Sequence, residues 1–133
     1  MYYFAYASNM NKKLMAERCP EGKPKIVATL PNHKLIFTGY SRIRHGAEAT
    51  IKGSKGDKIM GAIYEITESG LRKLDKFEGY PTNYKHLNVM VFTDSGQAFE
   101  AVTFVKATQE EEGKPAPEYL SAIQQGYRDW GIL

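Results

Sequence analysis

The sequence has a single cysteine and no long apolar segment. Cys19 excludes an intrachain disulfide, and a lone thiol is more often a packing residue than a nucleophile. No run of about 18 apolar residues is present that could cross a membrane as a helix. The opening MYYFAYASNM lacks a basic leader and a long apolar stretch, so it does not predict a signal peptide. We therefore expect a cytoplasmic protein in a reducing compartment, with no membrane partner.

An excess of charge of one sign is also missing. The 18 Lys and Arg residues against 15 Asp and Glu residues leave a formal net charge of +3, a field too weak to indicate nucleic acid as a partner by itself. His33, His45 and His86 have no spacing that resembles a metal site, and no second thiol accompanies them. The glycines between residues 53 and 56 precede no predicted helix, so they do not form a phosphate-binding loop. We expect neither a metal nor a cofactor.

The sequence contains enough apolar residues to form a hydrophobic core. A length of 133 residues with 42% apolar content predicts a single domain over residues 1–133, since a chain of this size buries roughly two-thirds of its unfolded surface. Strands are predicted at 2–6, 25–30, 34–38, 47–52, 58–66, 87–92 and 98–105. Turns are expected at 31–32, 53–57 and 93–96. Because most strands follow one another through short turns, the pattern predicts the α+β class: a small mixed or antiparallel β-barrel flanked by helices.

Helical patterns interrupt the strands at three places. We expect Asn9 to cap a short helix over 12–18. Thr67 is expected to cap a second helix, which ends at Gly79. A third helix near the C-terminus carries apolar residues spaced three, four and three apart, at Leu120, Ile123, Tyr127 and Trp130.

The second predicted helix places a carboxylate near its apolar face. Leu71, Leu74 and Phe77 define the apolar stripe, and Glu78 lies about 40° from the centre of that stripe at 100° per residue. Burial, the negative end of the helix dipole and the carboxylate of Asp75 one turn earlier all disfavour the Glu78 anion. We therefore predict a weaker acid than a free glutamate, able to take and return a proton near neutral pH. Periodicity alone leaves open that a Lys, an Arg or backbone amides simply satisfy this carboxylate.

A second feature is the junction Tyr6-Ala7-Ser8-Asn9, between an aromatic strand and the first helix. Such a junction presents free backbone N–H groups, and its small side chains let a ligand approach closely. The hydroxyl of Ser8 and the amide of Asn9 add hydrogen-bonding groups. The junction is suited to a carboxylate or a developing oxyanion, although an ordinary helix cap explains the same pattern.

Two further patterns are weaker. The loop Ser41-Arg42-Ile43-Arg44-His45 is basic and could meet an anionic group, but a solvated loop is the simpler interpretation. Nine tyrosines could line a polar pocket, although packing with the hydroxyl at the rim is the usual explanation.

Taken together, these segments resemble the gamma-glutamylcyclotransferase family, including its gamma-glutamylamine-specific relatives. The opening residues from Tyr3 to Met10 resemble the family's Y-G-S-N substrate loop, and 46–51 with 56–57 and 61–64 are similar to its central hairpin. The segment 74–80 is similar to the one that holds the catalytic glutamate. The resemblance covers nearly the whole chain, and its specific part is the order of these motifs.

The resemblance implies a catalytic role for Glu78 and a set of substrate-binding residues. These are Tyr3, Tyr6, Ala7, Ser8, Asn9, Tyr84 and Tyr119. It also implies a cofactor-independent acyl transfer, in which a small gamma-glutamyl substrate attacks its own γ-carbonyl and releases 5-oxoproline and a free amine. We expect a monomer or homodimer as the working unit.

One departure from the family pattern leaves alternatives open. Position 7 is Ala where the family has Gly, and a methyl there is costly only if the residue needs positive φ. This departure motivates a second hypothesis, a non-catalytic binding module with the same fold and pocket. A third hypothesis, a nucleic-acid-binding barrel, rests only on the basic loop, the aromatic residues and a pI near 8.9. Binding of that kind would weaken steeply with salt.

Overall fold

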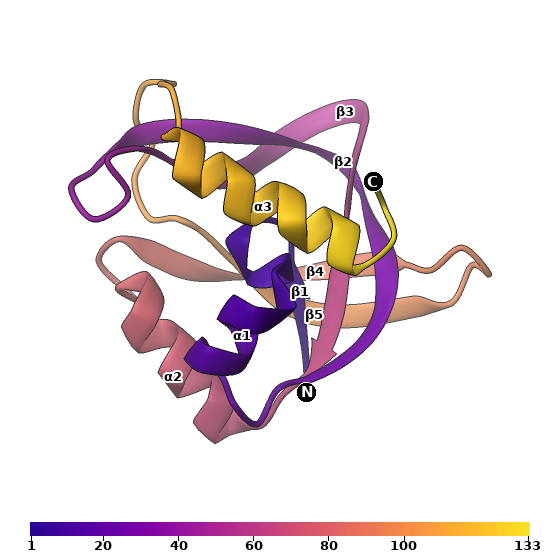
Figure 1. Ribbon diagram of the computed structural model, residues 1–133. Helices are drawn as coiled ribbons and strands as arrows, with labels where there is room; N and C mark the ends of the chain where they lie inside the picture. Colours follow the sequence, from indigo (N-terminus) through magenta and orange to yellow (C-terminus); the bar gives the residue numbers. More distant parts are fainter.

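The computed structural model describes residues 1–133, and its five strands close into a barrel (Figure 1). The strands are β1 (Tyr2–Ala5), β2 (Lys23–Ser41), β3 (Gly46–Glu65), β4 (Tyr84–Phe92) and β5 (Ala98–Lys106). Their order around the barrel is β1-β3-β2-β4-β5, and β5 closes the ring through a parallel contact with β1 at Tyr3 and Val102. All other pairs are antiparallel. The predicted α+β class with a mixed barrel is confirmed.

β2 and β3 are each one long strand where the sequence predicted two shorter ones. Their antiparallel ladder skips residues 54–57 of β3 opposite Asn32, so the predicted turn and the predicted hairpin are one bulge within a continuous pair. Asn32 has φ +60° there, and its side chain accepts a hydrogen bond from the Gly56 N–H at 3.1 Å. Glycine and asparagine mark bulges as well as turns because both tolerate the left-handed region. The hairpin turn that joins the two strands lies instead at 42–45.

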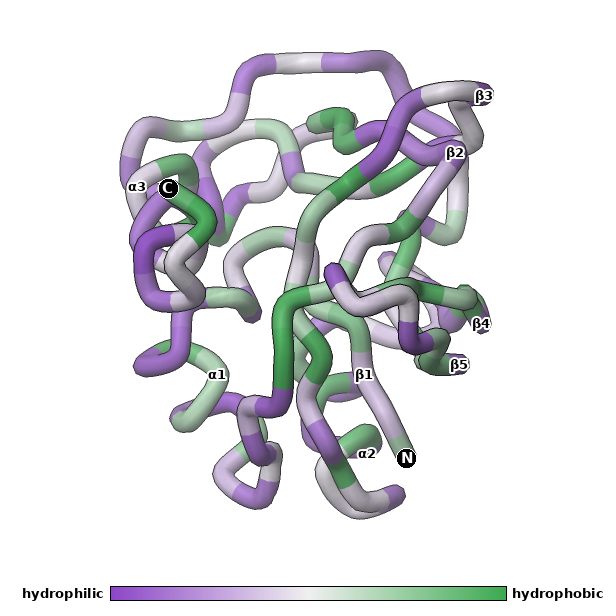
Figure 2. Tube along the Cα trace, turned by 90° about the vertical axis from the view of Figure 1, so that its right-hand side faces the viewer, coloured by the Kyte–Doolittle hydropathy of each residue, from purple (hydrophilic) through white to green (hydrophobic).

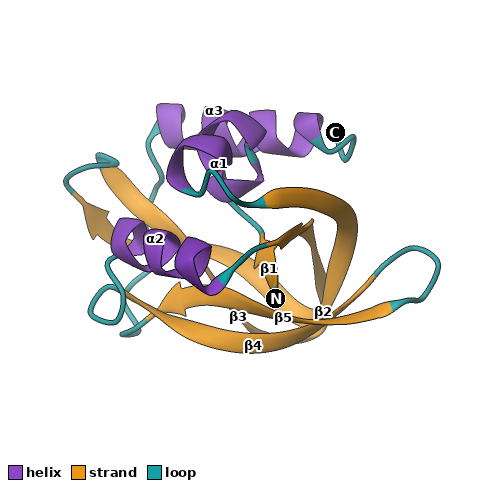
Figure 3. Ribbon diagram, turned by 90° about the horizontal axis from the view of Figure 1, so that it is seen from below, coloured by secondary structure: helices purple, strands orange, loops and turns teal.

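The helices gather along one side of the strands (Figure 3). They are α1 (Lys12–Arg18), α2 (Glu68–Glu78) and α3 (Pro117–Asp129), with a 3₁₀ turn, η1 (Ser8–Met10), before α1. The predicted cap of α1 is wrong, since Asn11 rather than Asn9 accepts the hydrogen bond from the Leu14 N–H. Thr67 caps α2 as predicted, through a bond from the Gly70 N–H. No helix of the chain combines the length and the apolar character needed to cross a membrane.

Two groups of buried side chains form the core. One fills the barrel and includes Phe4, Ile63 and Val91. The other lies between the barrel and the helices and includes Met10 and Leu74. In Figure 2 the green, apolar stretches run through the central strands, while many purple, hydrophilic stretches lie in the helices and outer loops.

α3 holds the 3₁₀ turn η1 against the barrel. A side chain at Gly126 would come within 2.6 Å of the Asn11 backbone nitrogen, so only glycine allows the helix to approach this closely. The Trp130 indole donates a hydrogen bond to the Met10 carbonyl at 2.9 Å. α3 and its C-terminal cap therefore fix the segment before α1 at two points, which gives the loop at residues 6–9 a defined position.

Candidate active site

A small hollow opens where β1, η1, the end of α2 and the start of α3 meet. It contains about 310 Å³ of space free of protein atoms, partly open to solvent. Its lining residues are Tyr3, Tyr6, Ala7, Ser8, Asn9, Arg44, Ala49, Glu78, Tyr84, Phe104 and Tyr119. The hollow thus brings together every site residue that the sequence analysis named, although those residues come from β1, the loop at residues 6–9, α2, β4 and α3.

Glu78 is the last residue of α2, and its side chain points into the hollow with only 13% of its surface exposed. Gly79 ends the helix directly after it in the left-handed region, at φ +73°. Leu74 anchors the buried face of α2, but Phe77 is 44% exposed, so the predicted apolar stripe is wrong at its last position. The Phe77 ring instead packs under the Arg18 guanidinium at 4.0 Å. The centre of the buried face is therefore shifted toward Glu78.

Burial raises the pKa of Glu78 from its ordinary value of 4.5 to about 7. The guanidinium groups of Arg44 and Arg18 oppose this shift in pKa, and the nearby carboxylate of Glu48 adds to it. The direction agrees with the predicted weak acid, but one predicted cause is wrong. Asp75 does not act on Glu78, because its carboxylate lies 2.6 Å from Nε2 of His86 and faces β4.

The loop at residues 6–9 faces Glu78 across the hollow. The backbone N–H groups of Ala7, Ser8 and Asn9 donate no hydrogen bond within the chain. They are therefore available to a ligand. Ala7 has φ −133° and ψ −127°, so it lies outside the left-handed region that favours glycine. The replacement of the family's Gly therefore narrows the loop without requiring the left-handed region.

The tyrosines of the hollow hold the surrounding backbone together. Tyr84 donates a hydrogen bond to the Ala49 carbonyl at 2.6 Å, and Tyr119 accepts one from the Ala49 N–H at 3.0 Å. Tyr3 accepts a hydrogen bond from the Asn9 side-chain amide at 2.8 Å, and Tyr6 donates one to the Phe104 carbonyl. Burial raises the pKa of all four phenols, so they are hydrogen-bond donors rather than anions at neutral pH. The hydroxyl hydrogens of Tyr3 and Tyr119 donate to no other group of the chain, which leaves them free for a ligand.

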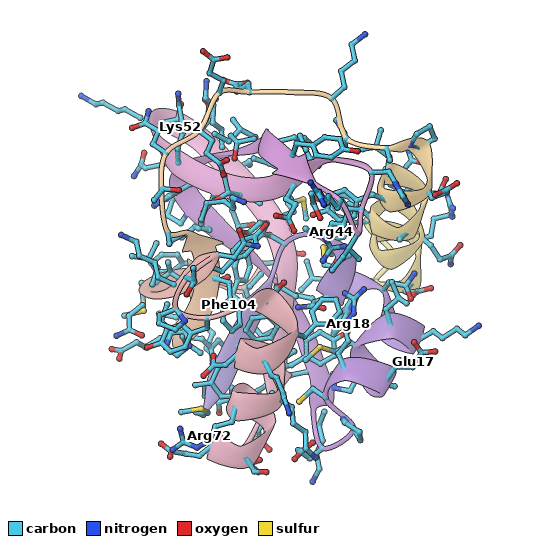
Figure 4. The ribbon with its side chains drawn as sticks, turned by 90° about the vertical axis from the view of Figure 1, so that its left-hand side faces the viewer. Glu17, Arg18, Arg44, Lys52, Arg72 and Phe104 are labelled. Atoms are coloured by element: carbon cyan, nitrogen blue, oxygen red, sulfur yellow. The ribbon has the colours of Figure 1, made fainter.

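Sequence reasoning missed two arginines that reach the same place. Arg18, on α1, donates hydrogen bonds to Ser8 Oγ at 2.9 Å and Asn9 Oδ1 at 2.8 Å. Arg44, in the β2–β3 turn, lies with Nη2 3.9 Å from Glu78 Oε1 and with its guanidinium 4.4 Å from the Tyr119 ring centre. Figure 4 shows both side chains on the face that carries α1, α2 and α3. The simpler interpretation of the basic loop at 41–45, a solvated loop, holds for the exposed Arg42, Ile43 and His45 but not for Arg44.

A second buried glutamate, also missed, holds Arg44 in place. Glu48 accepts a hydrogen bond from Arg44 Nε at 3.2 Å, and its other oxygen accepts from Lys106 Nζ at 3.1 Å and Asn83 Nδ2 at 3.2 Å. Burial alone would raise the pKa of Glu48, but these donors and the positive charges of Lys106 and Arg44 hold that pKa below its usual range. Glu48 is therefore a fixed anion, and no separate sequence signal pointed to it.

A larger groove continues outward from the hollow. It shares Ser8, Arg44, Glu78 and Tyr119 with the hollow and contains about 1230 Å³ of space, much of it open to solvent. Its outer walls come from α1, α2, α3 and the β2–β3 turn, at residues that include Leu14, Ile43, Lys76, Phe77, Glu118 and Ala122. A molecule bound with one end in the hollow would extend its other end along this groove.

The arrangement combines what a proton-transfer site for an anionic ligand needs. It has one buried carboxyl group with a pKa of about 7, backbone and tyrosine donors opposite it, and two guanidinium groups beside it. No group of three or more His, Cys, Asp or Glu side chains lies close enough together to hold a metal ion. Proton transfer and stabilisation of negative charge are the chemistry that these side chains can perform.

Comparisons with known proteins agree on one family. The sequence profile described as "Gamma-glutamyl cyclotransferase, AIG2-like" matches residues 3–126. The "Gamma-glutamylcyclotransferase" of Homo sapiens is 32% identical over 135 aligned positions, which cover 98% of this chain and 71% of the human protein. The Bos taurus protein of the same name is 33% identical with the same coverage. A solved structure named "Gamma-glutamyl cyclotransferase" superposes with a TM-score of 0.94 at 31% identity, covering 99% of this chain and 80% of its own.

Proposed function

The chain belongs to the AIG2-like gamma-glutamyl cyclotransferase family, and from this premise we propose that it converts a gamma-glutamyl amide to 5-oxoproline and a free amine or amino acid, with Glu78 as general acid and base. The observation that carries the proposal is the position of Glu78. It is a buried carboxyl group with a pKa of about 7, across a hollow from unpaired backbone N–H groups. A purely structural carboxylate would not need a pKa near neutrality.

The proposed reaction is an intramolecular acyl transfer. The α-amine of the glutamyl group attacks its own γ-carbonyl carbon, a new C–N bond closes a five-membered ring, and the original amide C–N bond breaks. Two protons move from the α-ammonium group to the leaving nitrogen, one at a time through Glu78, so the reaction neither gains nor loses a proton. A carboxyl group with a pKa of about 7 can serve in both directions at neutral pH.

The loop at residues 6–9 is proposed to bind the negative charges of the glutamyl group. Its free N–H groups can hold the α-carboxylate or the oxygen that becomes negative during attack. The O–H groups of Tyr3 and Tyr119 reach the same hollow and can donate as well. By folding the substrate so that its amine faces its own carbonyl, the narrow hollow would supply the entropic part of the catalysis.

The non-catalytic alternative has less support. Its motivation is Ala7, and that residue does not occupy the left-handed region that would require a glycine. The two hypotheses still predict different results, because a binding module would gain thermal stability from gamma-glutamyl compounds without converting any of them.

The test is a panel of gamma-glutamyl compounds assayed for 5-oxoproline, with gamma-glutamyl-alanine and ε-(gamma-glutamyl)-lysine as the first two. We expect product from at least one, and we expect Glu78→Gln to lower kcat about 10²- to 10⁴-fold. The matched control is Glu68→Gln, at an exposed position on the same helix. A folded Glu78→Gln variant with full activity would refute the role of this carboxyl group, and a panel without product would favour the binding module.

A further inference from the structure

We propose that Arg44, oriented by Glu48, is the residue that determines leaving-group specificity by binding a carboxylate next to the scissile nitrogen. The inference rests on the proposed function, and it assigns a role to a residue of the β2–β3 turn that the proposed proton transfer does not use. It concerns the boundary between the hollow and the outer groove, since Arg44 and Glu78 line both.

The hydrogen-bonding state of Arg44 is the first argument. Only its Nε donates to another side chain, to Glu48, while Nη1 and Nη2 make no hydrogen bond within the chain. The side chain as a whole is only 15% exposed, and it lines both the hollow and the outer groove. A guanidinium fork with two unpaired nitrogens matches the two oxygens of a carboxylate.

The fixed geometry of Arg44 is the second argument. Glu48 holds Nε, and the guanidinium carbon lies 4.4 Å from the centre of the Tyr119 ring, so the side chain is restricted by two neighbours. Glu48 is itself held by Lys106 and Asn83, and Lys106 also pairs with Glu110. Because Glu48 uses only Nε, the edge of Arg44 that carries Nη1 and Nη2 is held in place without a hydrogen-bonded anion of its own.

The position next to Glu78 is the third argument. Because Glu78 must reach the leaving nitrogen in the proposed reaction, the atoms bonded to that nitrogen lie beside it, and Arg44 Nη2 is 3.9 Å from Glu78 Oε1. An α-carboxylate is only two bonds from the scissile nitrogen, so it falls within reach of Arg44. Arg18 is a poorer candidate, because its Nη1 already donates to Ser8 and Asn9. Lys76 and Glu118 lie farther out on the exposed walls of the groove.

The experiment compares gamma-glutamyl-alanine with gamma-glutamyl-alaninamide, which differ only in whether the leaving group carries a carboxylate or a carboxamide. We expect the wild-type protein to prefer the carboxylate at least tenfold in kcat/KM, and Arg44→Gln to reduce that preference to near one. Arg44→Lys should retain part of the preference, since it keeps the charge without the fork. Arg42→Gln, an exposed arginine of the same turn, is the matched control and should keep the full preference.

Two outcomes overturn the proposal: equal use of both substrates by the wild-type protein, or an undiminished preference in Arg44→Gln. If neither compound is cyclised, the proposed function fails, and titration calorimetry of the same two compounds then decides the inference separately. Tighter binding of the carboxylate compound that depends on Arg44 would support it. Equal binding of both compounds, or a difference that survives Arg44→Gln, would overturn it.

Discussion

Glu78 and Glu48 are two mostly buried glutamates on either side of the same arginine, yet their pKa values move in opposite directions. Glu78 is near Arg44 and Arg18 but accepts no hydrogen bond from any side chain, and burial raises its pKa to about 7. Glu48 is similarly buried, but three side chains donate to it and its pKa falls below the usual range. Direct donors, more than nearby charge, separate a titrating carboxyl group from a permanent anion. We infer that Glu78 carries the proton and that Glu48 holds Arg44 in place.

The largest expected difference between the two glutamates is in activity. Glu78→Gln should lower kcat about 10²- to 10⁴-fold, because it removes the proton carrier. Glu48→Gln should lower kcat/KM only about tenfold, because it loosens Arg44 but leaves Glu78 in place. Steady-state assays of both variants on one gamma-glutamyl substrate check this order. Equal losses in the two variants would contradict the division of roles.

Stability should change in opposite directions. Since folding raises the pKa of Glu78, the folded protein binds more protons than the unfolded chain between about pH 4.5 and 7, and stability falls as pH rises through this window. A shift of this size corresponds to about 3 kcal/mol at pH 8. We therefore expect Glu78→Gln to be more stable than wild type at pH 8, by up to that amount, with the difference vanishing below pH 4.5.

Glu48 gives the reverse sign. Its lowered pKa contributes stability that is present above its ordinary pKa and lost as pH falls through the folded value. We expect Glu48→Gln to be about 1–3 kcal/mol less stable than wild type at pH 8, since Lys106 and Arg44 lose a charged acceptor. Urea unfolding of both variants at pH 8 and pH 4 measures the two effects, and destabilisation of both variants at pH 8 would count against the comparison.

The pH dependence of activity offers a finer test. With Glu78 as the base of the free enzyme, kcat/KM should rise about tenfold per pH unit below pH 7 and level off above it. Glu48→Gln removes a negative neighbour and should move this limb to lower pH, whereas Arg44→Gln removes a positive neighbour and should move it to higher pH. Profiles of kcat/KM from pH 5 to 9 measure both. If the pH-dependent rise in kcat/KM moved in the same direction in both variants, the group that titrates in this profile would not be Glu78.

The smallest expected effect lies across the hollow, at Ala7. Because φ is already negative there, Ala7→Gly should change kcat/KM less than about threefold, while the more flexible unfolded chain lowers stability by about 0.4–1 kcal/mol. Thermal unfolding and the 5-oxoproline assay measure the two quantities. A large gain in kcat/KM would show that the Ala7 methyl group itself limits activity by narrowing the loop.

The sequence was sufficient for the elements whose signals are local. α1 spans the predicted residues although Asn11 caps it, α2 follows Thr67 and ends before Gly79 as predicted, and β4 and β5 pair around the predicted turn. The β2–β3 pair was divided wrongly, because Asn32 and Gly56 signal a left-handed residue without showing whether the chain reverses there. That distinction depends on pairing across the barrel, which no local pattern contains.

The same limit applies to the site. Helical periodicity placed Glu78 near the apolar face, but it could not show that Asp75 turns toward His86. The sequence favours a solvated loop around Arg44 and carries no separate signal for Glu48, because only the closed barrel brings these residues to the end of α2. Arg44 and Glu48 pair locally, but the contacts of Arg44 with Glu78 and of Glu48 with Lys106 join residues far apart in the chain. Such contacts produce no periodic pattern in the sequence.

The pair of tyrosine contacts at Ala49 ties the lining of the hollow to the strength of the barrel. The N–H of Ala49 donates to the Tyr119 hydroxyl and its C=O accepts from the Tyr84 hydroxyl, so phenols satisfy both polar backbone groups of this buried residue. A buried polar group that loses its partner costs about 1–3 kcal/mol. Replacing either tyrosine with phenylalanine would therefore weaken the fold along with ligand binding.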